Sequence, residues 1–442
     1  MSDLSIRLHA YPHRIILYTV LNMNIYPLSL KKVLITLLSG AMLMTQMNSP
    51  AFALTDQAKA VNPTIETRAY TIESLPTADK IDVITYKMPY RNGNIQDTTA
   101  LVFYPKSEMP KDGWRIVVWT HGTVGVGDAC APSNNTINTN FKVALDALLE
   151  EGYVVLAPDY EGLGTPGIHP YLNLESEALS VIYGVTALEA SNADMFEGSW
   201  MVVGQSQGGQ AALGTAEYAN LDPQFKGTVA GAPASGLLEI IRDVAPKQLT
   251  ELNASEAAQG IALEDRNAVQ SLATILTYGA LAGIGLKATY PDFDYLSLFY
   301  PSAREFAKSA EGTNGEDGLC LHPVRDLFKA DLIKFMEENP DKPMLAYPGI
   351  DQEAFHNHPR LLEFFKANQP GTKRLDKPVL IIQGTEDTNV PAVVTKELVK
   401  NLKALGSSDI ELILVEGASH TQAIIWKNDE LVKFIKQYMP AK

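Results

Sequence analysis

Residues 200–209 read Trp-Met-Val-Val-Gly-Gln-Ser-Gln-Gly-Gly. The first four residues are apolar and predict a buried strand, whereas residues 210–218 are compatible with a helix. At such a sharp strand-to-helix turn, a serine flanked by glycines is held clear of its own backbone and can act as a nucleophile. We therefore predict that Ser206 is a nucleophile and that the Gln207 N–H faces a developing oxyanion. The pattern alone also fits an ordinary glycine-rich turn.

The composition is that of a globular protein. The chain has 442 residues, of which 46% are hydrophobic and 20% are charged. This length allows one large domain with an insertion, or two domains. Its 36 basic and 51 acidic residues give a formal net charge of −15, which disfavours binding to a phosphate backbone. Nucleic acid is therefore not an expected partner.

The first 53 residues have the features of an export signal. Lys31 and Lys32 precede an apolar run over residues 33–44, and residues 51–53 supply an Ala-x-Ala pattern that predicts cleavage after Ala53. The run is shorter than the roughly 20 apolar residues that a membrane-spanning helix needs. We expect an exported protein, periplasmic or extracellular, without a stable membrane anchor, so that any contact with a lipid interface is transient.

Export bears on whether the two cysteines, Cys130 and Cys320, form a disulfide. In an oxidising compartment they are the only possible intrachain pair, and a bridge between them would tie an early loop to a much later region. Two free buried thiols are the alternative.

Apolar runs that alternate with helical segments predict a mostly parallel sheet covered by helices on both faces. The Asn92-Gly93 dipeptide favours a tight turn, so the first two strands should form an antiparallel hairpin. Between residues 236 and 375 no strand alternation occurs, and we expect helices there, such as those over residues 267–276, 324–338 and 359–367. We predict an α/β fold, with a mostly parallel sheet flanked by helices, that comprises a signal peptide (1–53), a first core part (54–235), an inserted helical cap (236–375) and a second core part (376–442). Eight strands are expected, over residues 81–87, 98–104, 115–120, 153–157, 200–203, 227–231, 378–383 and 410–415.

A nucleophilic serine needs a base and a group that orients the base. Asp387 follows the expected strand 378–383 and His420 follows strand 410–415, which places both at the strand ends where parallel sheets carry their sites. We predict a Ser206–Asp387–His420 triad, and this chain order is typical of the α/β-hydrolase fold, which we therefore predict for the two core parts. Glu386 is an alternative acid, and a helix-capping carboxylate is the alternative role for Asp387.

A second oxyanion donor should come from the loop that follows strand 115–120. This loop begins His121-Gly122-Thr123, and we favour the Thr123 N–H over that of Gly122, with a simple tight turn as the alternative. We expect the His121 imidazole to brace the turn. The remaining histidines outside the leader lie in loops without metal-ligand spacing, so neither a metal nor a cofactor is predicted. They are His169, His322, His356 and His358.

Two further stretches carry a family resemblance. Residues 121–133 read His-Gly-Thr-Val-Gly-Val-Gly-Asp-Ala-Cys-Ala-Pro-Ser, and residues 158–164 read Pro-Asp-Tyr-Glu-Gly-Leu-Gly. Both resemble the secretory lipase family within the α/β-hydrolase superfamily. The resemblance implies carboxylic ester hydrolysis, often of acyl lipids, under a helical cap, with a disulfide at Cys130. Some members form the oxyanion hole without a His-Gly pair, which leaves the second donor open.

The sequence thus predicts a secreted serine esterase or lipase that forms an acyl-enzyme with a small-molecule or lipid ester. An exported serine peptidase of the same fold and a catalytically silent binding protein are the alternatives. The apolar stretch 272–286 is compatible with an acyl tunnel and with an ordinary helical core, and we favour the core interpretation.

Overall fold

The computed structural model describes residues 50–62 and 65–441, and it contains a sheet of nine strands. Of the predicted signal peptide, residues 1–49 lie outside the described part. The first described helix, α2 (Pro50–Val61), begins just before the predicted cleavage point. The order of the strands across the sheet is β1-β2-β3-β5-β4-β6-β7-β8-β9. Their bounds are Glu66–Ala69, Ala78–Pro89, Ile95–Pro105, Trp114–Thr120, Val154–Pro158, Phe196–Gln205, Phe225–Gly231, Val379–Gly384 and Ile410–Val415, for β1 to β9 in turn.

Six neighbouring strands, from β5 to β9 across the sheet, run parallel, whereas β1, β2 and β3 extend the sheet antiparallel. The predicted hairpin joins β2 to β3, and its turn is closed by a 2.9 Å hydrogen bond from Gly93 N to Tyr90 O. Gly93 has φ of +82°, a conformation that glycine adopts without strain. The parallel strands β4, β5 and β6 are almost entirely buried, which explains their continuous apolar sequences.

The strand count differs from the prediction by one. We expected eight strands, and the structure adds β1, a four-residue edge strand that pairs antiparallel with β2. All four of its residues, Glu66 to Ala69, are exposed. A short exposed edge strand buries nothing, so it leaves no apolar alternation by which the sequence could reveal it.

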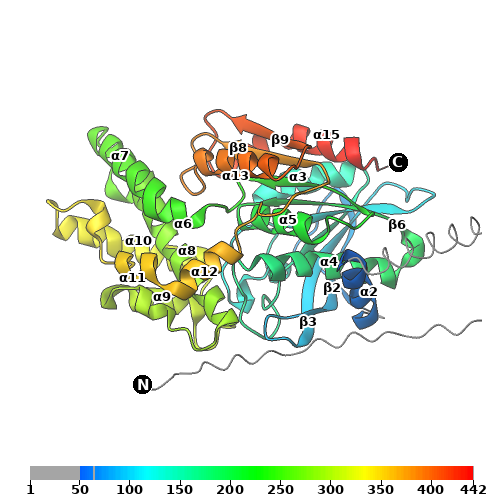
Figure 1. Cartoon of the computed structure of the whole chain (residues 1–442), viewed down its shortest axis with the longest axis horizontal. Helices are drawn as coiled ribbons and strands as arrows, with labels where there is room; N and C mark the ends of the chain where they lie inside the picture. Colours follow the sequence, from blue (N-terminus) through cyan, green and yellow to red (C-terminus); the bar gives the residue numbers. More distant parts are fainter. Residues whose placement is uncertain (1–49, 63–64, 442) are drawn as a thin grey trace, which may run out of the picture. The chain divides into compact units, whose positions relative to one another are not determined.

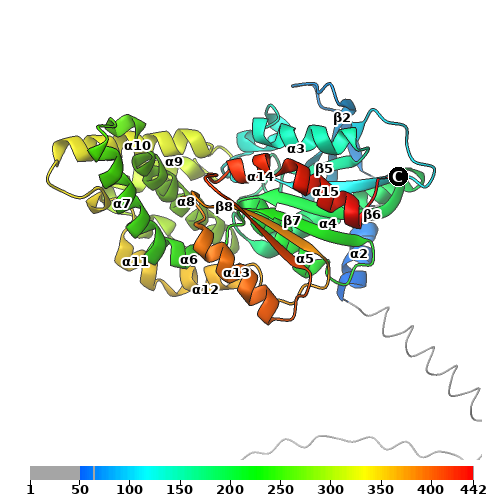
Figure 2. The same ribbon diagram turned by 90° about the horizontal axis from the view of Figure 1, so that it is seen from above.

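Helices cover both faces of the sheet (Figure 2). Helices α4 (Leu174–Ser191), α5 (Gln207–Tyr218) and α13 (Ala392–Ala404) pack on one face together with α2. The other face is covered by α3 (Thr139–Glu150), α14 (Gln422–Trp426) and α15 (Asn428–Tyr438). Two of these helices start at an asparagine cap: Asn138 Oδ1 accepts from backbone amides of α3, and Asn173 Oδ1 accepts from Ser176 N in α4.

The long connection from β7 to β8 is helical (Figure 1). It contributes no strand to the nine-stranded sheet within the described residues, and its helices share an apolar core to which Val126, Tyr171, Leu172, Val390 and Val394 also contribute. The insertion predicted over residues 236–375 falls in this connection, although its boundaries stay a prediction. The helices are α6 (Leu237–Glu239), α7 (Ala245–Ala258), α8 (Asn267–Thr289), α9 (Arg304–Glu311), α10 (Leu321–Glu338), α11 (Gln352–Asn357) and α12 (Pro359–Ala367).

Helix α8 is the central helix of this connection and is longer than the expected segment 267–276. It is long and apolar enough to cross a membrane, but 78% of its most apolar window is buried inside the protein. Small residues permit this burial: a Cβ atom on Gly285 would lie 2.3 Å from the Tyr171 carbonyl oxygen. Such burial is typical of a core helix, in line with the interpretation favoured from the sequence.

Candidate active site

Ser206 occupies the turn between β6 and α5. Its backbone angles, φ 62° and ψ −119°, are sparsely populated for a residue with a side chain. The two flanking glycines let β4 approach this turn closely. A Cβ on Gly204 would lie 2.0 Å from Thr120 Oγ1, and one on Gly208 would lie 1.9 Å from the Thr120 carbonyl oxygen. Any larger residue at either position would push β4 away from the turn.

Three residues predicted to act together do lie together. His420, in the loop after β9, places its Nε2 atom 2.8 Å from Ser206 Oγ. Its Nδ1 atom lies 2.7 Å from Oδ2 of Asp387, in the loop after β8. Because a carboxylate only accepts hydrogen bonds, Nδ1 carries the proton and Nε2 is left free to accept from the serine hydroxyl. Glu386, the alternative acid, is exposed and lies outside this chain of hydrogen bonds.

The loops that carry the acid and the histidine are themselves held in place. Asp387 is 1% exposed, and its Oδ1 accepts from the backbone amides of Asn389 and Val390 at 2.8 and 2.9 Å. Gln383 Nε2, at the end of β8, donates to Oδ2 at 3.0 Å. Gln205 Nε2 donates to the His420 carbonyl oxygen at 3.1 Å. The orientation of the imidazole is therefore fixed from both sides.

The loop after β4 lies against the serine turn. A Cβ on Gly122 would lie 3.2 Å from the Gln205 carbonyl oxygen and 3.6 Å from Ser206 Cβ. His121 Nδ1 lies 2.7 Å from the Gly122 carbonyl oxygen, and in a trans peptide the following Thr123 N–H points the opposite way. Burial lowers the pKa of His121, so the ring stays neutral, as a bracing group should. The donor roles of Gly122 and Thr123 stay predictions.

The predicted cysteine pair is joined in the structure. Cys130, in the loop after β4, forms a disulfide with Cys320, which directly precedes α10. Two backbone hydrogen bonds of 2.8 Å, from Leu321 N to Val124 O and from Asp128 N to Glu316 O, join the same two segments. The loop that carries Thr123 is thus fastened to the helical connection.

A mainly apolar cavity surrounds Ser206. Helix α8 contributes four residues to its wall, so this helix both forms core and lines the site. No charged side chain is among the described residues that line the cavity. They are Tyr171, Leu172, Ser206, Ala234, Leu237, Ile240, Ile241, Ile275, Tyr278, Gly279, Ala282, Phe355, Phe365, Asn389 and Val390.

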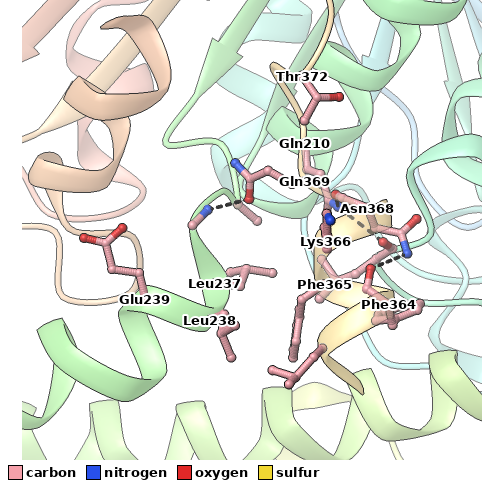
Figure 3. A pocket seen from close by; sticks show the side chains of 14 residues that line it. Gln210, Leu237, Leu238, Glu239, Phe364, Phe365, Lys366, Asn368, Gln369 and Thr372 are labelled. Atoms are coloured by element: carbon pink, nitrogen blue, oxygen red, sulfur yellow. Dashed lines mark hydrogen bonds between the residues drawn. The ribbon is translucent and has the colours of Figure 1, made fainter. Parts of the chain in front are cut away.

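A second cavity adjoins the first, and Leu172, Ala234, Leu237 and Phe365 belong to the walls of both. Figure 3 shows that it lies between α6 and the end of α12, with amide side chains at its upper end. Gln369 Oε1 accepts there from Gly236 N at 2.9 Å. Glu239 and Lys366 also belong to its lining. Apolar walls with amide and charged groups suit an amphipathic group better than a purely hydrocarbon one.

Sequence reasoning missed a set of ionisable residues buried behind Ser206. Burial raises the pKa of Asp159 to about 6, of Glu161 to about 7 and of Glu177 to about 8, and lowers that of His169 to about 3. Glu177 carried no distinct signal in the sequence, because Glu175 stands in the same first turn of α4, where acidic residues are favourable. No cluster of three potential metal ligands occurs among residues 50–62 and 65–441.

Two family models match separate parts of the chain. The secretory lipase family model matches residues 131–280, which include Ser206. The prolyl oligopeptidase family model matches residues 341–441, which include Asp387 and His420. Among curated proteins, none is significantly similar in sequence.

Solved structures share the fold. A candidate hydrolase from Legionella pneumophila is 19% identical with a TM-score of 0.61, over 87% of this chain and 95% of that one. The rice cell wall degrading esterase LipA from Xanthomonas oryzae, in a ligand-bound form, is 16% identical with a TM-score of 0.59, over 85% and 96%. Candida antarctica lipase A in its closed state is 16% identical with a TM-score of 0.60, over 85% and 82%. The chain therefore has the α/β-hydrolase fold, and its residues 131–280 are similar to the secretory lipase family.

Proposed function

We propose that this protein is an exported carboxylic ester hydrolase whose catalytic residues are Ser206, Asp387 and His420. The observation that carries the proposal is the pair of hydrogen bonds at His420, 2.8 Å to Ser206 Oγ and 2.7 Å to Asp387 Oδ2. A serine hydroxyl, an imidazole and a buried carboxylate in this order form the arrangement that activates a serine for acyl transfer.

The reaction would proceed in two halves. His420 Nε2 takes the Ser206 proton as Oγ attacks the ester carbonyl, and the amides of Gln207 and Thr123 stabilise the tetrahedral oxyanion. His420 then gives its proton to the departing alkoxide, which leaves an acyl-enzyme. In the second half His420 takes a proton from water as the water attacks, and returns it to Ser206 as the acid leaves. No step needs a metal or a cofactor.

The cavity walls support an acyl substrate. An uncharged, mainly apolar cavity around Ser206 favours a hydrocarbon acyl group because its burial removes apolar surface from water. The adjoining cavity, with Gln369 and Asn368 at its polar end, suits the alcohol part of the same ester. We therefore propose a small-molecule or lipid ester as substrate, with no nucleic acid partner and no permanent membrane anchor.

Export is the second part of the proposal. A disulfide between Cys130 and Cys320 is expected to persist in an oxidising compartment, and the secretory lipase match points the same way. Cleavage after Ala53 would release the mature protein into the periplasm or the medium. Protein sequencing of the N-terminus of the secreted form tests this, because a mature chain beginning at Leu54 is expected.

The activity test compares esters with amides. Purified protein should hydrolyse p-nitrophenyl butyrate or p-nitrophenyl palmitate, and a fluorophosphonate probe should label the wild type but not Ser206→Ala. A wild type that the probe leaves unlabelled, under conditions that label a control esterase, would favour a silent binding protein. Equal labelling of Ser206→Ala would place the nucleophile elsewhere.

A serine peptidase is the competing function, and the prolyl oligopeptidase match over residues 341–441 favours it. An exopeptidase would need a charged group to hold a peptide terminus. The described lining of the Ser206 cavity offers none, whereas Glu239 and Lys366 line the adjoining cavity. Aminoacyl and proline-containing nitroanilides decide between the two. Hydrolysis of nitroanilides without hydrolysis of either ester would overturn the esterase proposal.

A further inference from the structure

Behind Ser206 lies a buried polar network that ester hydrolysis, as proposed, leaves without a role. Gln207 is the first residue of α5, and its side-chain Nε2 donates to Glu177 Oε1 on α4 at 2.8 Å. The same nitrogen lies 3.2 Å from Nε2 of His169, whose Nδ1 lies 2.8 Å from the Glu161 carbonyl oxygen. Gln207, Glu177 and His169 are each at most 1% exposed.

The partners fix where the hydrogens are. A carbonyl oxygen only accepts, so His169 carries its proton on Nδ1 and accepts at Nε2. An amide nitrogen has two hydrogens, and Gln207 thus uses one toward His169 and the other toward Glu177. Burial lowers the pKa of His169 to about 3, which keeps the imidazole in this neutral form.

Glu177 fits the network as an uncharged acid. Its Oε1 accepts from Gln207, while its Oε2 has no hydrogen-bond partner among the described residues. The ionisable groups near it are the hydroxyls of Tyr160 and Tyr171, and its remaining polar neighbour is the backbone of Leu172, so no positive charge offsets a carboxylate there. Burial raises the pKa of Glu177 to about 8.

Gln207 is also the residue whose main-chain N–H would face the oxyanion. The preceding Ser206 has φ of 62°, a strained conformation that persists only where its surroundings hold it. Thr120 packs against Gly204 and Gly208 on one side of the turn. The Gln207 side chain anchors the same turn to α4 and to the loop that carries His169.

We propose that Glu177 and His169 are positioning residues for hydrolysis: by holding the Gln207 side chain they set the direction of the Gln207 main-chain N–H. The inference rests on the proposed function. A loosened N–H weakens a contact that is strongest in the transition state and leaves substrate binding nearly unchanged. Loss of the network should therefore lower kcat and leave KM almost as it was.

The test compares two replacements of Glu177 with p-nitrophenyl butyrate as substrate. Glu177→Leu removes the acceptor, and we expect kcat to fall about 10- to 100-fold with KM changed less than about threefold. Glu177→Gln keeps an uncharged acceptor for Gln207, and we expect it to retain kcat within about threefold of the wild type. Gln207→Leu keeps the main-chain N–H but breaks the network, and it should lose kcat as Glu177→Leu does.

Helix α4 offers a matched control. The pKa of Glu189 is also raised to about 8 by burial, but the charged groups near this residue are Asp222, Lys59 and Glu197, and it is not part of the network. Glu189→Leu should therefore leave kcat within about twofold of the wild type. A trifluoromethyl ketone gives an independent readout because its serine adduct carries an oxyanion, so its inhibition constant should rise in parallel with the loss of kcat.

Two results would overturn the proposal. One is a folded Glu177→Leu protein, judged by circular dichroism, whose kcat equals that of Glu189→Leu. The other is a Glu177→Gln variant that loses as much activity as Glu177→Leu, because a charge and not an acceptor would then be required. A wild type inactive on all esters and unlabelled by fluorophosphonate would instead refute the proposed function, and this is seen before any variant is compared.

Discussion

Asp387 accepts hydrogen bonds from Asn389 N, Val390 N, Gln383 Nε2 and His420 Nδ1 although it is only 1% exposed. These partners hold its carboxylate in one orientation, and that orientation decides which nitrogen of His420 bears the proton. The single residue therefore sets the tautomer on which the proposed chemistry depends.

Replacement of Asp387 by asparagine tests whether this residue sets the tautomer of His420, because it exchanges one carboxylate oxygen for an NH₂ group. The amide of Asp387→Asn can present N–H to His420 Nδ1, which favours the tautomer that cannot accept the Ser206 proton. We expect kcat for p-nitrophenyl butyrate to fall about 10⁴-fold with the fold intact. Steady-state kinetics of Asp387→Asn and of Glu386→Gln check this, because Glu386 is the exposed neighbour and should tolerate the change. A loss below about tenfold in Asp387→Asn would assign the carboxylate a capping role only.

The sequence could predict the three residues whose places follow from strand ends. Ser206, Asp387 and His420 each stand directly after a strand that its apolar run reveals, and parallel strands bring such ends together. Glu177, His169 and Gln207 come together for a different reason. Their contact depends on how α4 and α5 pack and on the path of a loop, and no spacing in the sequence encodes either.

At the scale of secondary-structure elements, too, some bounds follow from the local sequence, whereas others depend on packing. Helix α12 occupies the expected range, Pro359–Ala367, because a proline opens it, and proline fits the first turn of a helix. Helix α8 runs well beyond the expected range because small residues such as Gly283 and Gly285 are tolerated where neighbours pack against them. Helix propensity alone would place these glycines at the end of a helix. Packing, and not local preference, therefore decides the length of α8.

The segment that joins β4 to the helical connection is the element on which a second prediction depends. A Cβ on Gly127 would lie 2.3 Å from the Gly318 carbonyl oxygen, and Cys130 is bonded to Cys320 beside this contact. The segment also carries Thr123, whose Oγ1 lies 2.8 Å from Tyr171 Oη at the Ser206 cavity. Loss of the disulfide should therefore also disturb the position of Thr123, the proposed oxyanion donor.

We expect the double variant Cys130→Ala/Cys320→Ala to be less stable by about 2–5 kcal/mol, since the bridge closes a loop of 190 residues. Its kcat should also fall, because Thr123 loses a restraint. Urea denaturation and steady-state kinetics measure the two effects. Dithiothreitol should lower the unfolding midpoint of the wild type and leave that of the double variant unchanged. An unchanged midpoint in the double variant would show that the backbone contacts alone hold the segment.

At the scale of the whole molecule, several buried acids lie in α4 and in the loop after β5. Burial raises the pKa of Glu161 to about 7, and those of Glu177 and Glu189 to about 8, from an ordinary value of 4.5. Between the ordinary pKa of 4.5 and these raised values, the folded chain binds more protons than the unfolded chain does. Its free energy of unfolding therefore decreases as the pH rises through this window.

His169 acts in the opposite direction, but only at lower pH. Its pKa is lowered by burial from 6.5 to about 3, so the unfolded chain binds the extra proton and stability rises with pH between these values. The unfolded histidine is half deprotonated at pH 6.5, so this contribution to the pH dependence, and the similar one of His121, diminishes above pH 6.5 and the acids then dominate. The decline in stability should therefore be steepest between pH 6.5 and 8.

Urea denaturation at intervals from pH 6.5 to 8 measures this slope, and we expect the unfolding free energy to fall throughout. Glu177→Gln removes one of the titrating groups while keeping the shape of its side chain, so its slope should be shallower than that of the wild type. Glu386→Gln replaces an exposed acid and should leave the slope as it is. A wild type whose stability stays level or rises over this range would mean that the buried acids are ionised and solvated in the native protein, and Glu177 could not then serve Gln207 as an uncharged acceptor.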